Sequence, residues 1–305
     1  MQNQIEPKVC VIIPNKNGAK HLYYSLDSLA KTNYKNYNVI LVDDGSADES
    51  LIYVKDKFPE IKILENIGKK GFAGAVNTGI KYALSQNAHY VAVFNTDIKI
   101  LPEWINLVVD LFDKLSTVGL IGYTAIPKEE EISFVNWKNI DFKYEEIKDS
   151  KGVEGCLYLC PSAVFRHIGF FDEDYFMYGE DNDLFHRLLK ANYKIIKTNI
   201  PVWHYGEGSS INKGFFATWL AYRNALRFSI KNENIIGVFF KVLSLLNQGC
   251  NPFRKRKKHN SVYKRMRRYN PILNFLIIIG SILWNIYHLP ITIKQRNIFN
   301  SNCKE

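Results

Sequence analysis

The sequence predicts an α/β protein with a mostly parallel β-sheet flanked by helices, because short β-branched runs alternate with helical segments over its first hundred residues. The composition agrees with this fold class. Of 305 residues, 47% are hydrophobic and 23% are charged, which excludes a disordered chain and a low-complexity fibre. Polar side chains follow each of the first four predicted strands, at the edge where ligands bind in such sheets.

The first half of the chain gives the clearest pattern. Runs of β-branched and other apolar side chains predict four buried strands, at residues 9–13, 38–42, 61–64 and 90–94. Apolar side chains at helical spacing predict the helices between them, at residues 22–29, 51–58 and 73–84. The first apolar run is too short for the core of a secretory signal, so we expect a cytoplasmic protein.

The second half is less regular. Residues 126–150 are charged and carry alternating segments, which favours a hairpin or a loop over the sheet edge. Two further strands are predicted at 155–160 and 193–196. Three further helices are predicted at 161–167, 184–189 and 215–230.

The formal net charge of +10 comes from one end of the chain. Residues 234–305 hold 13 of the 40 basic residues and a single acidic one, Glu305, so residues 1–233 carry 27 basic and 29 acidic side chains. A basic tail could bind nucleic acid. That alternative leaves the acidic strand ends unexplained, since they would repel phosphate unless a cation intervened, and we therefore expect no nucleic-acid partner. Five scattered cysteines without a CxxC pair argue against a disulfide scaffold and a cysteine-built zinc site.

Polar residues at four strand ends form the first candidate site. They are Pro14, Asn15 and Asn17 after the first strand, Asp43 and Asp44 after the second, Asn66 after the third, and Asn95 and Asp97 after the fourth. Any one of them alone is explained by a turn or a helix cap. Because parallel strands deliver their carboxyl ends to one edge, their joint occurrence favours a ligand site.

Carboxylates also cluster before the helix predicted at 184–189. Glu180, Asp181 and Asp183 follow an aromatic stretch, and enclosure of that kind raises the pKa of a carboxyl and readies it as a general base. The alternative is a helix N-terminus, where acidic side chains meet the positive end of the dipole.

Three further segments are candidates for binding a metal ion or a phosphate group. Asp97 and Asn95 lie two residues apart, and their oxygens suit a hard divalent cation. His204 is either a third ligand or a packed aromatic neighbour. The glycine-rich stretch from Gly68 to Gly79 is a weak phosphate-binding signal, because it matches neither a Walker loop nor a dinucleotide fingerprint.

Together these segments resemble the family 2 glycosyltransferases of the GT-A fold, with the closest similarity to the bacterial rhamnosyltransferase-type branch that builds surface polysaccharides. The matching stretches are VCVIIPNKNG at 9–18, VILVDDGSADES at 39–50, NIGKKGFAGAVNTGI at 66–80 and VFNTD at 93–97. They continue with GFFDEDYFMYGEDNDLFHRLLKANYKI at 169–195, VWHYGEGSS at 202–210 and YRNALRF at 222–228. The resemblance covers about residues 8–230, and the 169–195 block is its most specific part.

The resemblance implies a role for each matching residue. It assigns the nucleotide to Pro14, Asn15, Asn17, Asp43 and Asp44, and the remaining nucleotide-sugar contacts to Asn66, Gly71, Asn77, Asn95 and Glu180. The family's DxD motif reads Asn95-Thr96-Asp97 here, so Asp97 is the expected contact for a divalent metal (Mg²⁺ or Mn²⁺), with His204 completing the site. Asp181 matches the catalytic base.

The resemblance also implies the reaction. We expect an inverting transfer of a sugar from a nucleotide-diphosphate donor, with dTDP-L-rhamnose as one candidate, to a glycan or lipid-linked glycan acceptor. Galactosyl, glucosyl and N-acetylhexosaminyl donors remain alternatives.

The chain is expected to divide into a GT-A catalytic domain at 1–232 and a helical, basic and apolar region at 233–305. Nine basic residues between 254 and 268 precede an uncharged stretch at 269–293. This pattern favours contact of residues 250–293 with an anionic membrane surface at the inner face of the cell membrane. A membrane-spanning helix and a helix packed on the protein are the alternatives.

Overall fold

The computed structural model describes residues 6–126, 141–149, 152–206, 214–251 and 269–302. Their contacts divide the chain into two units, Met1–Phe176 with Asp181–Ser209, and Met177–Glu180 with Ser210–Glu305. The basic cluster at 254–268 and residues 127–140 of the predicted hairpin lie outside the described residues.

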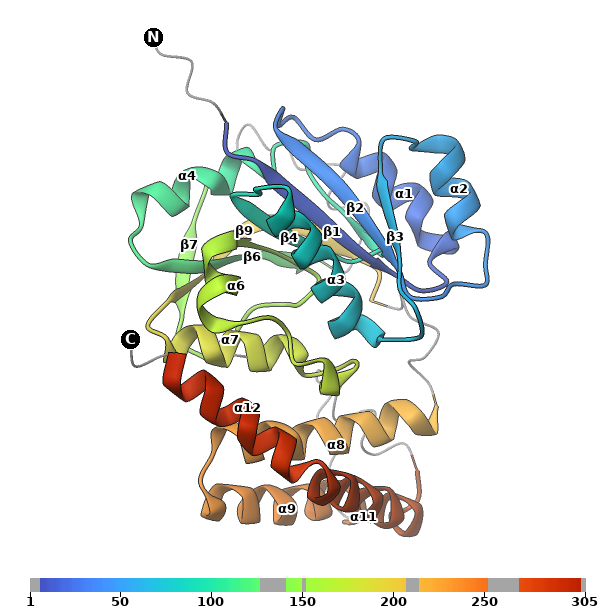
Figure 1. Ribbon diagram of the computed structural model, residues 1–305, viewed down its shortest axis with the longest axis vertical. Helices are drawn as coiled ribbons and strands as arrows, with labels where there is room; N and C mark the ends of the chain where they lie inside the picture. Colours follow the sequence, from blue (N-terminus) through green and yellow to red (C-terminus); the bar gives the residue numbers. More distant parts are fainter. Residues whose placement is uncertain (1–5, 127–140, 150–151, 207–213, 252–268, 303–305) are drawn as a thin grey trace. The chain divides into compact units, whose positions relative to one another are not determined.

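Among the residues that the structure describes, a nine-stranded mixed sheet forms the centre of the first unit, in the order β3-β2-β1-β4-β8-β6-β9-β5, with β7 paired to β9 (Figure 1). The four predicted strands form its parallel half, as β1 (Val9–Asn15), β2 (Tyr37–Asp43), β3 (Lys62–Glu65) and β4 (Tyr90–Phe94). The α/β class with a mostly parallel sheet is therefore confirmed.

The rest of the sheet is mixed, because strands of both directions occur in it. The antiparallel strand β8 (Leu157–Pro161) lies between β4 and β6 (Val118–Ile126), and β9 (Lys194–His204) runs parallel to β6. The short strands β5 (Ile98–Lys99) and β7 (Tyr144–Ile147) pair antiparallel to β9. The sequence patterns missed β5 and β6, and they missed the helix α4 (Asn106–Lys114).

The side chains of β1 point alternately to the two faces of the sheet, and helices pack against them on both faces. Val9, Val11 and Ile13 point into one core, which also holds apolar side chains of α1 (Ala19–Leu29), α2 (Ser50–Lys57) and α4. Ile12 points to the other face, where a Cβ on Gly79 of α3 (Gly71–Ser85) would lie 2.4 Å from its Cγ2. The chain then continues through α6 (Ser162–Ile168), the 3₁₀ helix η2 (Glu173–Tyr175) and α7 (Glu180–Lys190).

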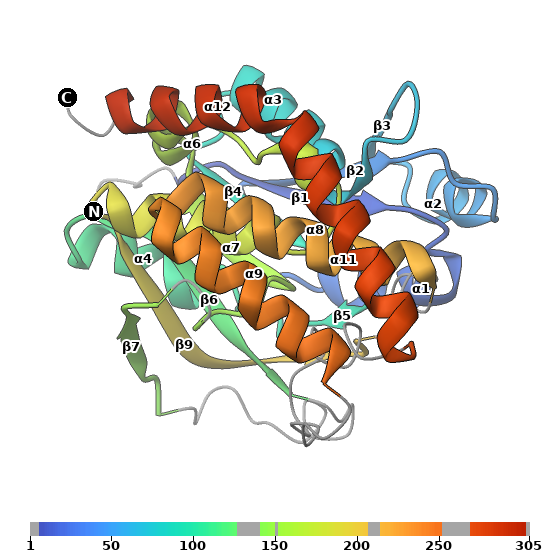
Figure 2. The same ribbon diagram turned by 90° about the horizontal axis from the view of Figure 1, so that it is seen from below.

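The described part of the second unit is a bundle of four helices, α8 (Phe215–Asn232), α9 (Ile235–Cys250), α11 (Pro271–Tyr287) and α12 (Leu289–Asn302) (Figure 2). Asn234 and Asn270 cap α9 and α11 through their side-chain oxygens. The core of the bundle contains Tyr222 and Leu226 of α8, Leu245 of α9, and Ile277 and Ile278 of α11. The unit thus includes α8, which precedes the division expected at residue 232.

The apolar helices of this unit bear on the predicted membrane contact. Among the described residues, no single helix has both the length and the apolar character to cross a bilayer. Pro271–Tyr287 and Leu289–Asn300 meet those criteria only as a pair bent by 63°.

Candidate active site

Asp43 organises the loop ends of β1 and β2. Its carboxylate accepts hydrogen bonds from the backbone N–H groups of Gly45 and Ser46, at 3.0 and 2.9 Å, and from the side-chain amide of Asn15 at 2.9 Å. Asn15 also donates to the hydroxyl of Ser50 at 3.0 Å. Asp43 and Asn15 are buried, and their contacts fix the turn that carries Asp44.

Asp44 ties the third strand end to the start of α3. One carboxylate oxygen accepts from the side-chain amide of Asn66 at 3.0 Å and from the backbone N–H of Lys70 at 2.8 Å. The other accepts from the backbone N–H of Gly71 at 2.9 Å. The structure therefore brings Asn15, Asp43, Asp44 and Asn66 together at one sheet edge, as their positions after the strands predict, and the Asp44 carboxylate joins Gly71 to them.

Three other residues were predicted at the site. Pro14 is half-buried within β1. Asn17 is exposed, with a φ of 52°, and its side-chain oxygen accepts from the backbone N–H of Ala47 at 2.8 Å, so it belongs to the same edge. Asn77 is buried in α3, where its amide donates to the carbonyl of Phe171 and to Glu173, both at 2.9 Å, and its oxygen accepts from the N–H of Phe171. In this structure Asn77 joins α3 to the segment that precedes α7.

A group of possible metal ligands gathers where β5 begins beside the end of β9, at the pair Ile98 and His204. The Nε2 atom of His204 lies 3.4 Å from Oδ2 of Asp97, which is buried. Ligand atoms of Glu154, Cys156 and His204 lie within 4.8 Å of one another. Burial lowers the pKa of His204, but hydrogen bonds to Asp97 and Cys156 outweigh it and raise the pKa to about 10.

These residues fit a divalent cation. Asn95 has a buried side-chain oxygen that accepts no hydrogen bond within the described structure, and its backbone N–H bonds to the carbonyl of Cys156 at 3.0 Å. Carboxylate, amide and imidazole groups are ordinary ligands for Mn²⁺, while Mg²⁺ prefers oxygen. Asp97 and His204 were predicted as ligands. Glu154 and Cys156 were not, because they belong to no local motif.

Asp181 lies beside this group. Its Oδ1 accepts a hydrogen bond from the hydroxyl of Tyr158 at 2.9 Å, and its Oδ2 occupies the space in which a Cβ on Gly155 would stand. Gly155 is the residue between Glu154 and Cys156. Burial raises the pKa of Asp181 to about 7, although the Tyr158 hydrogen bond lowers it. Such a carboxylate can accept a proton near neutral pH.

The neighbouring acids of α7 have other surroundings. Asp183 is fully buried and accepts from Nε of Arg187 at 2.9 Å, while Arg187 also donates to the carbonyls of Ile168 and Phe170. This ion pair fixes α7 to the segment after α6. Glu180 is buried at the start of α7 and belongs to the second unit.

A methyl group at position 155 should displace the Asp181 carboxylate. The new Cβ of Gly155→Ala would stand 2.1 Å from Oδ2 of Asp181. Because misplacing a reacting group by about 1 Å can lower a rate by two orders of magnitude, we expect transfer to fall on the order of 100-fold. Gly280→Ala, whose Cβ meets nothing within 4 Å, is the control. Equal steady-state rates for both variants would show that the position of Asp181 does not matter.

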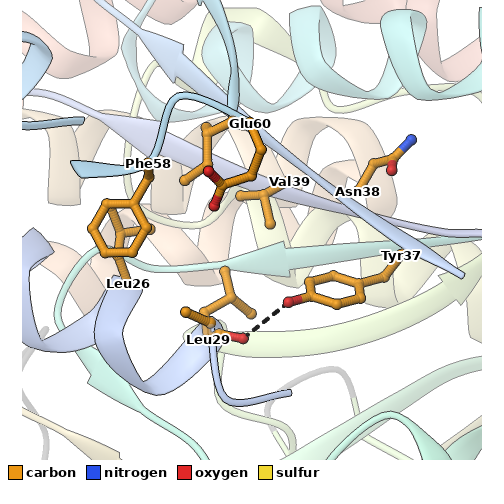
Figure 3. A pocket seen from close by; sticks show the side chains of 9 residues that line it. Leu26, Leu29, Tyr37, Asn38, Val39, Phe58 and Glu60 are labelled. Carbon is orange, nitrogen blue, oxygen red and sulfur yellow. Dashed lines mark hydrogen bonds between the residues drawn. The ribbon is translucent and has the colours of Figure 1, made fainter. Parts of the chain in front are cut away.

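A pocket lies elsewhere in the first unit. It has a volume of about 310 Å³ and is lined by Leu26 and Leu29 of α1, Phe58, and the first residues of β2, including Tyr37 and Val39 (Figure 3). The Tyr37 hydroxyl donates to the carbonyl of Leu29 at 3.2 Å. This pocket lies at the opposite end of β2 from Asp43 and contains none of the candidate site residues.

Comparison with known proteins identifies the family. Residues 10–170, more than half of the chain, match the model of Glycosyl transferase family 2. The chain belongs to this family. An uncharacterized glycosyltransferase of Rickettsia prowazekii is 29% identical over 63% of this chain, and the match spans 61% of the relative's own length, about three fifths.

Two further proteins extend the comparison of this family 2 chain. The UDP-Glc:alpha-D-GlcNAc-diphosphoundecaprenol beta-1,3-glucosyltransferase WfgD of Escherichia coli is 27% identical over 60% of this chain and 70% of its own. The mannosyltransferase PcManGT of Pyrobaculum calidifontis, solved with GDP-Man and Mn²⁺, superposes with a TM-score of 0.55 at 16% identity, covering 94% of this chain and 76% of its own. The fold is therefore GT-A-like, with a mostly parallel mixed sheet flanked by helices.

Proposed function

We propose that this family 2 chain is an inverting glycosyltransferase that moves a sugar from a nucleotide-diphosphate donor to a glycan or lipid-linked glycan acceptor. The observation that carries the proposal is the half-buried carboxylate of Asp181, with its pKa raised to about 7, beside the group of Asp97, Cys156 and His204. A base next to a site for a cation is what displacement of a diphosphate needs.

The residues have separate tasks in this reaction. Asp181 takes the proton of an acceptor hydroxyl, and the oxygen forms a bond to the anomeric carbon as the bond from that carbon to the diphosphate breaks. The electron pair leaves with the nucleoside diphosphate, and the configuration at carbon inverts. Asp97 and His204 would hold a divalent cation, Mn²⁺ or Mg²⁺, which supplies positive charge for the leaving diphosphate.

The nucleotide would lie along the first three strand ends. Asp44, whose oxygens hold Asn66 and the N-terminus of α3, sets the shape of that edge, and Asn15 and Asp43 support it. Pro14, Asn17, Asn77, Asn95 and Glu180 are proposed as further nucleotide-sugar contacts on the sequence resemblance.

The donor and acceptor are finer proposals. The sequence resemblance favours dTDP-L-rhamnose, with galactosyl, glucosyl and N-acetylhexosaminyl donors as alternatives. The name of the Escherichia coli relative specifies a sugar on diphosphoundecaprenol, which supports a lipid-linked acceptor here. Such an acceptor would place the enzyme at the inner face of the cell membrane.

A donor panel tests the proposal. Purified protein is first screened by thermal shift against nucleotide sugars with Mn²⁺ or Mg²⁺, since a ligand of the folded state raises the apparent stability. The stabilising donor is then incubated with and without acceptor. Release of nucleoside diphosphate only with acceptor supports transfer, whereas release of nucleoside monophosphate would indicate cleavage of the diphosphate instead.

A further inference from the structure

Helix α11 hides its polar side chains inside the second unit. Asn274, Ser281 and Asn285 are each 1% exposed. Asn274 donates to the carbonyl of Gly249 in α9 at 2.9 Å, and Asn285 donates to the carbonyl of Arg223 in α8 at 3.0 Å. The helix is thus joined to its neighbours partly through hydrogen bonds, which water cannot reach.

The opposite face of α11 is apolar and exposed. It consists of Ile272, Phe275, Leu276, Ile279, Leu283 and Ile286, which are between 38% and 76% exposed. These positions recur at intervals of three and four residues, so they form one stripe along the helix. A helix of a water-soluble protein usually has the reverse arrangement, with polar side chains outward.

Helix α9 repeats this exposed apolar face. Its stripe consists of Ile235, Ile236, Phe239, Phe240 and Leu243, which are between 45% and 85% exposed. Leu245 and Gly249 face the core of the unit instead, where Gly249 lies against the hydroxyl of Tyr222. Helices α9 and α11 pack beside each other and both contact α8 (Figure 2). The second unit therefore carries two adjoining apolar stripes, more than a monomer in water usually exposes.

The charge of residues 234–304 indicates what kind of partner covers the apolar stripes of α9 and α11. Residues 234–304 contain no acidic side chain and 13 basic ones. A second copy of the same chain would bring like charges together at such an interface, whereas an anionic lipid surface complements them. Apolar stripes accompanied only by positive charge are typical of helices that lie in a membrane interface.

We propose that the exposed stripes of α9 and α11 form a monotopic membrane-binding face, which lies in the interfacial layer of an anionic bilayer without crossing it. In-plane binding agrees with the lengths of α9 and α11, since neither helix alone could span a bilayer and α11 meets the criteria only together with α12 across a 63° bend. The proposal adds α9 to the region predicted from sequence. It concerns residues of the second unit, whereas Asp97, Asp181 and His204 belong to the first, so it stands whichever sugar is transferred.

Vesicle binding by the full chain tests this face. The probe is extruded vesicles of phosphatidylcholine with or without phosphatidylglycerol, and the readout is the fraction of protein that floats with them. We expect flotation with the anionic vesicles to persist at about 0.5 M NaCl, where electrostatic attraction alone is screened. Phe239→Glu/Phe240→Glu and Leu276→Glu/Leu283→Glu should each bind at least about tenfold more weakly, because each removes two large apolar contacts.

The control is Ile52→Glu/Tyr144→Glu, which adds the same charge at exposed apolar positions of the first unit, 72% and 48% exposed. It should bind vesicles as the parent does. Circular dichroism and the donor-induced thermal shift should be unchanged in every variant, which excludes unfolding. Parent-like flotation of both α9 and α11 variants would overturn the proposal. So would a parent that stays off the vesicles but forms a dimer that these variants dissociate, since the occupant would then be a second copy.

Discussion

Asp181→Asn should fold as the parent does and lose sugar transfer by about 10²–10⁴-fold, the usual contribution of a general base. The asparagine keeps the size of the side chain and can still accept the hydrogen bond from the Tyr158 hydroxyl. It cannot take the proton of the acceptor. The measurement is the rate of nucleoside diphosphate release at saturating donor and acceptor, and donor affinity should change little.

The pH dependence of the parent follows from the same carboxyl. Because the pKa of Asp181 is raised to about 7, the base is protonated below that pH and the rate should fall there. Tyr158→Phe removes the hydrogen bond that lowers this pKa, so the acidic limb of the rate profile should move to higher pH. Asp183→Asn is a poor control, since it leaves Arg187 buried beside a neutral group.

Stability supplies an independent check on Asp181. Its pKa in the folded state lies above the ordinary value of 3.8 for an aspartate, so the folded state holds a proton that the unfolded state has released between pH 3.8 and about 7. The carboxyl therefore lowers stability as pH rises through that window, and the loss is complete above about 7. Asp181→Asn should accordingly melt no lower than the parent at about pH 8. Near-parental turnover, or a rate profile without an inflection near neutral pH, would remove Asp181 from the role of base.

The parallel half of the sheet and its polar edge were predictable because their determinants are local. The Asp43 carboxylate accepts hydrogen bonds from backbone N–H groups two and three residues away, so a few consecutive residues determine the conformation of the turn. Tyr158 and Gly155 were not predictable. They reach Asp181 only because β8 runs antiparallel to β4, and Tyr158 is 23 residues from its partner.

The second unit also combines features set by local sequence with features set by distant residues. The uncharged stretch at 269–293 indicated a helix suited to a membrane, and the spacing of Asn274, Ser281 and Asn285 places them on one helical face. Whether that face turns inward depends on the partners of α11. Those partners are carbonyl groups of α8 and α9, which sequence patterns alone do not bring to the helix.

Asp97→Asn should weaken Mn²⁺ binding at least about tenfold and lower transfer by about 100-fold. The substitution removes the buried carboxylate that faces His204 and retains its shape. Cation affinity in such a site depends on ligand charge, so a neutral amide at this position holds the ion less well. Affinity is measured by titrating Mn²⁺ into the protein and following the electron paramagnetic resonance signal of the unbound ion, with nucleoside diphosphate present.

Asp110→Asn is the matched control, because its carboxylate is exposed on α4, where it pairs with Lys114. It should bind Mn²⁺ as the parent does. Asp97→Asn also takes from His204 one of the partners that raise its pKa, so the imidazole should titrate at lower pH in the variant, which NMR can follow. A shifted His204 titration with unchanged Mn²⁺ affinity would leave Asp97 as a partner of the histidine and place the cation elsewhere. Loss of Mn²⁺ binding together with transfer, in a variant that melts like the parent, is the result expected of a metal ligand at the end of β4.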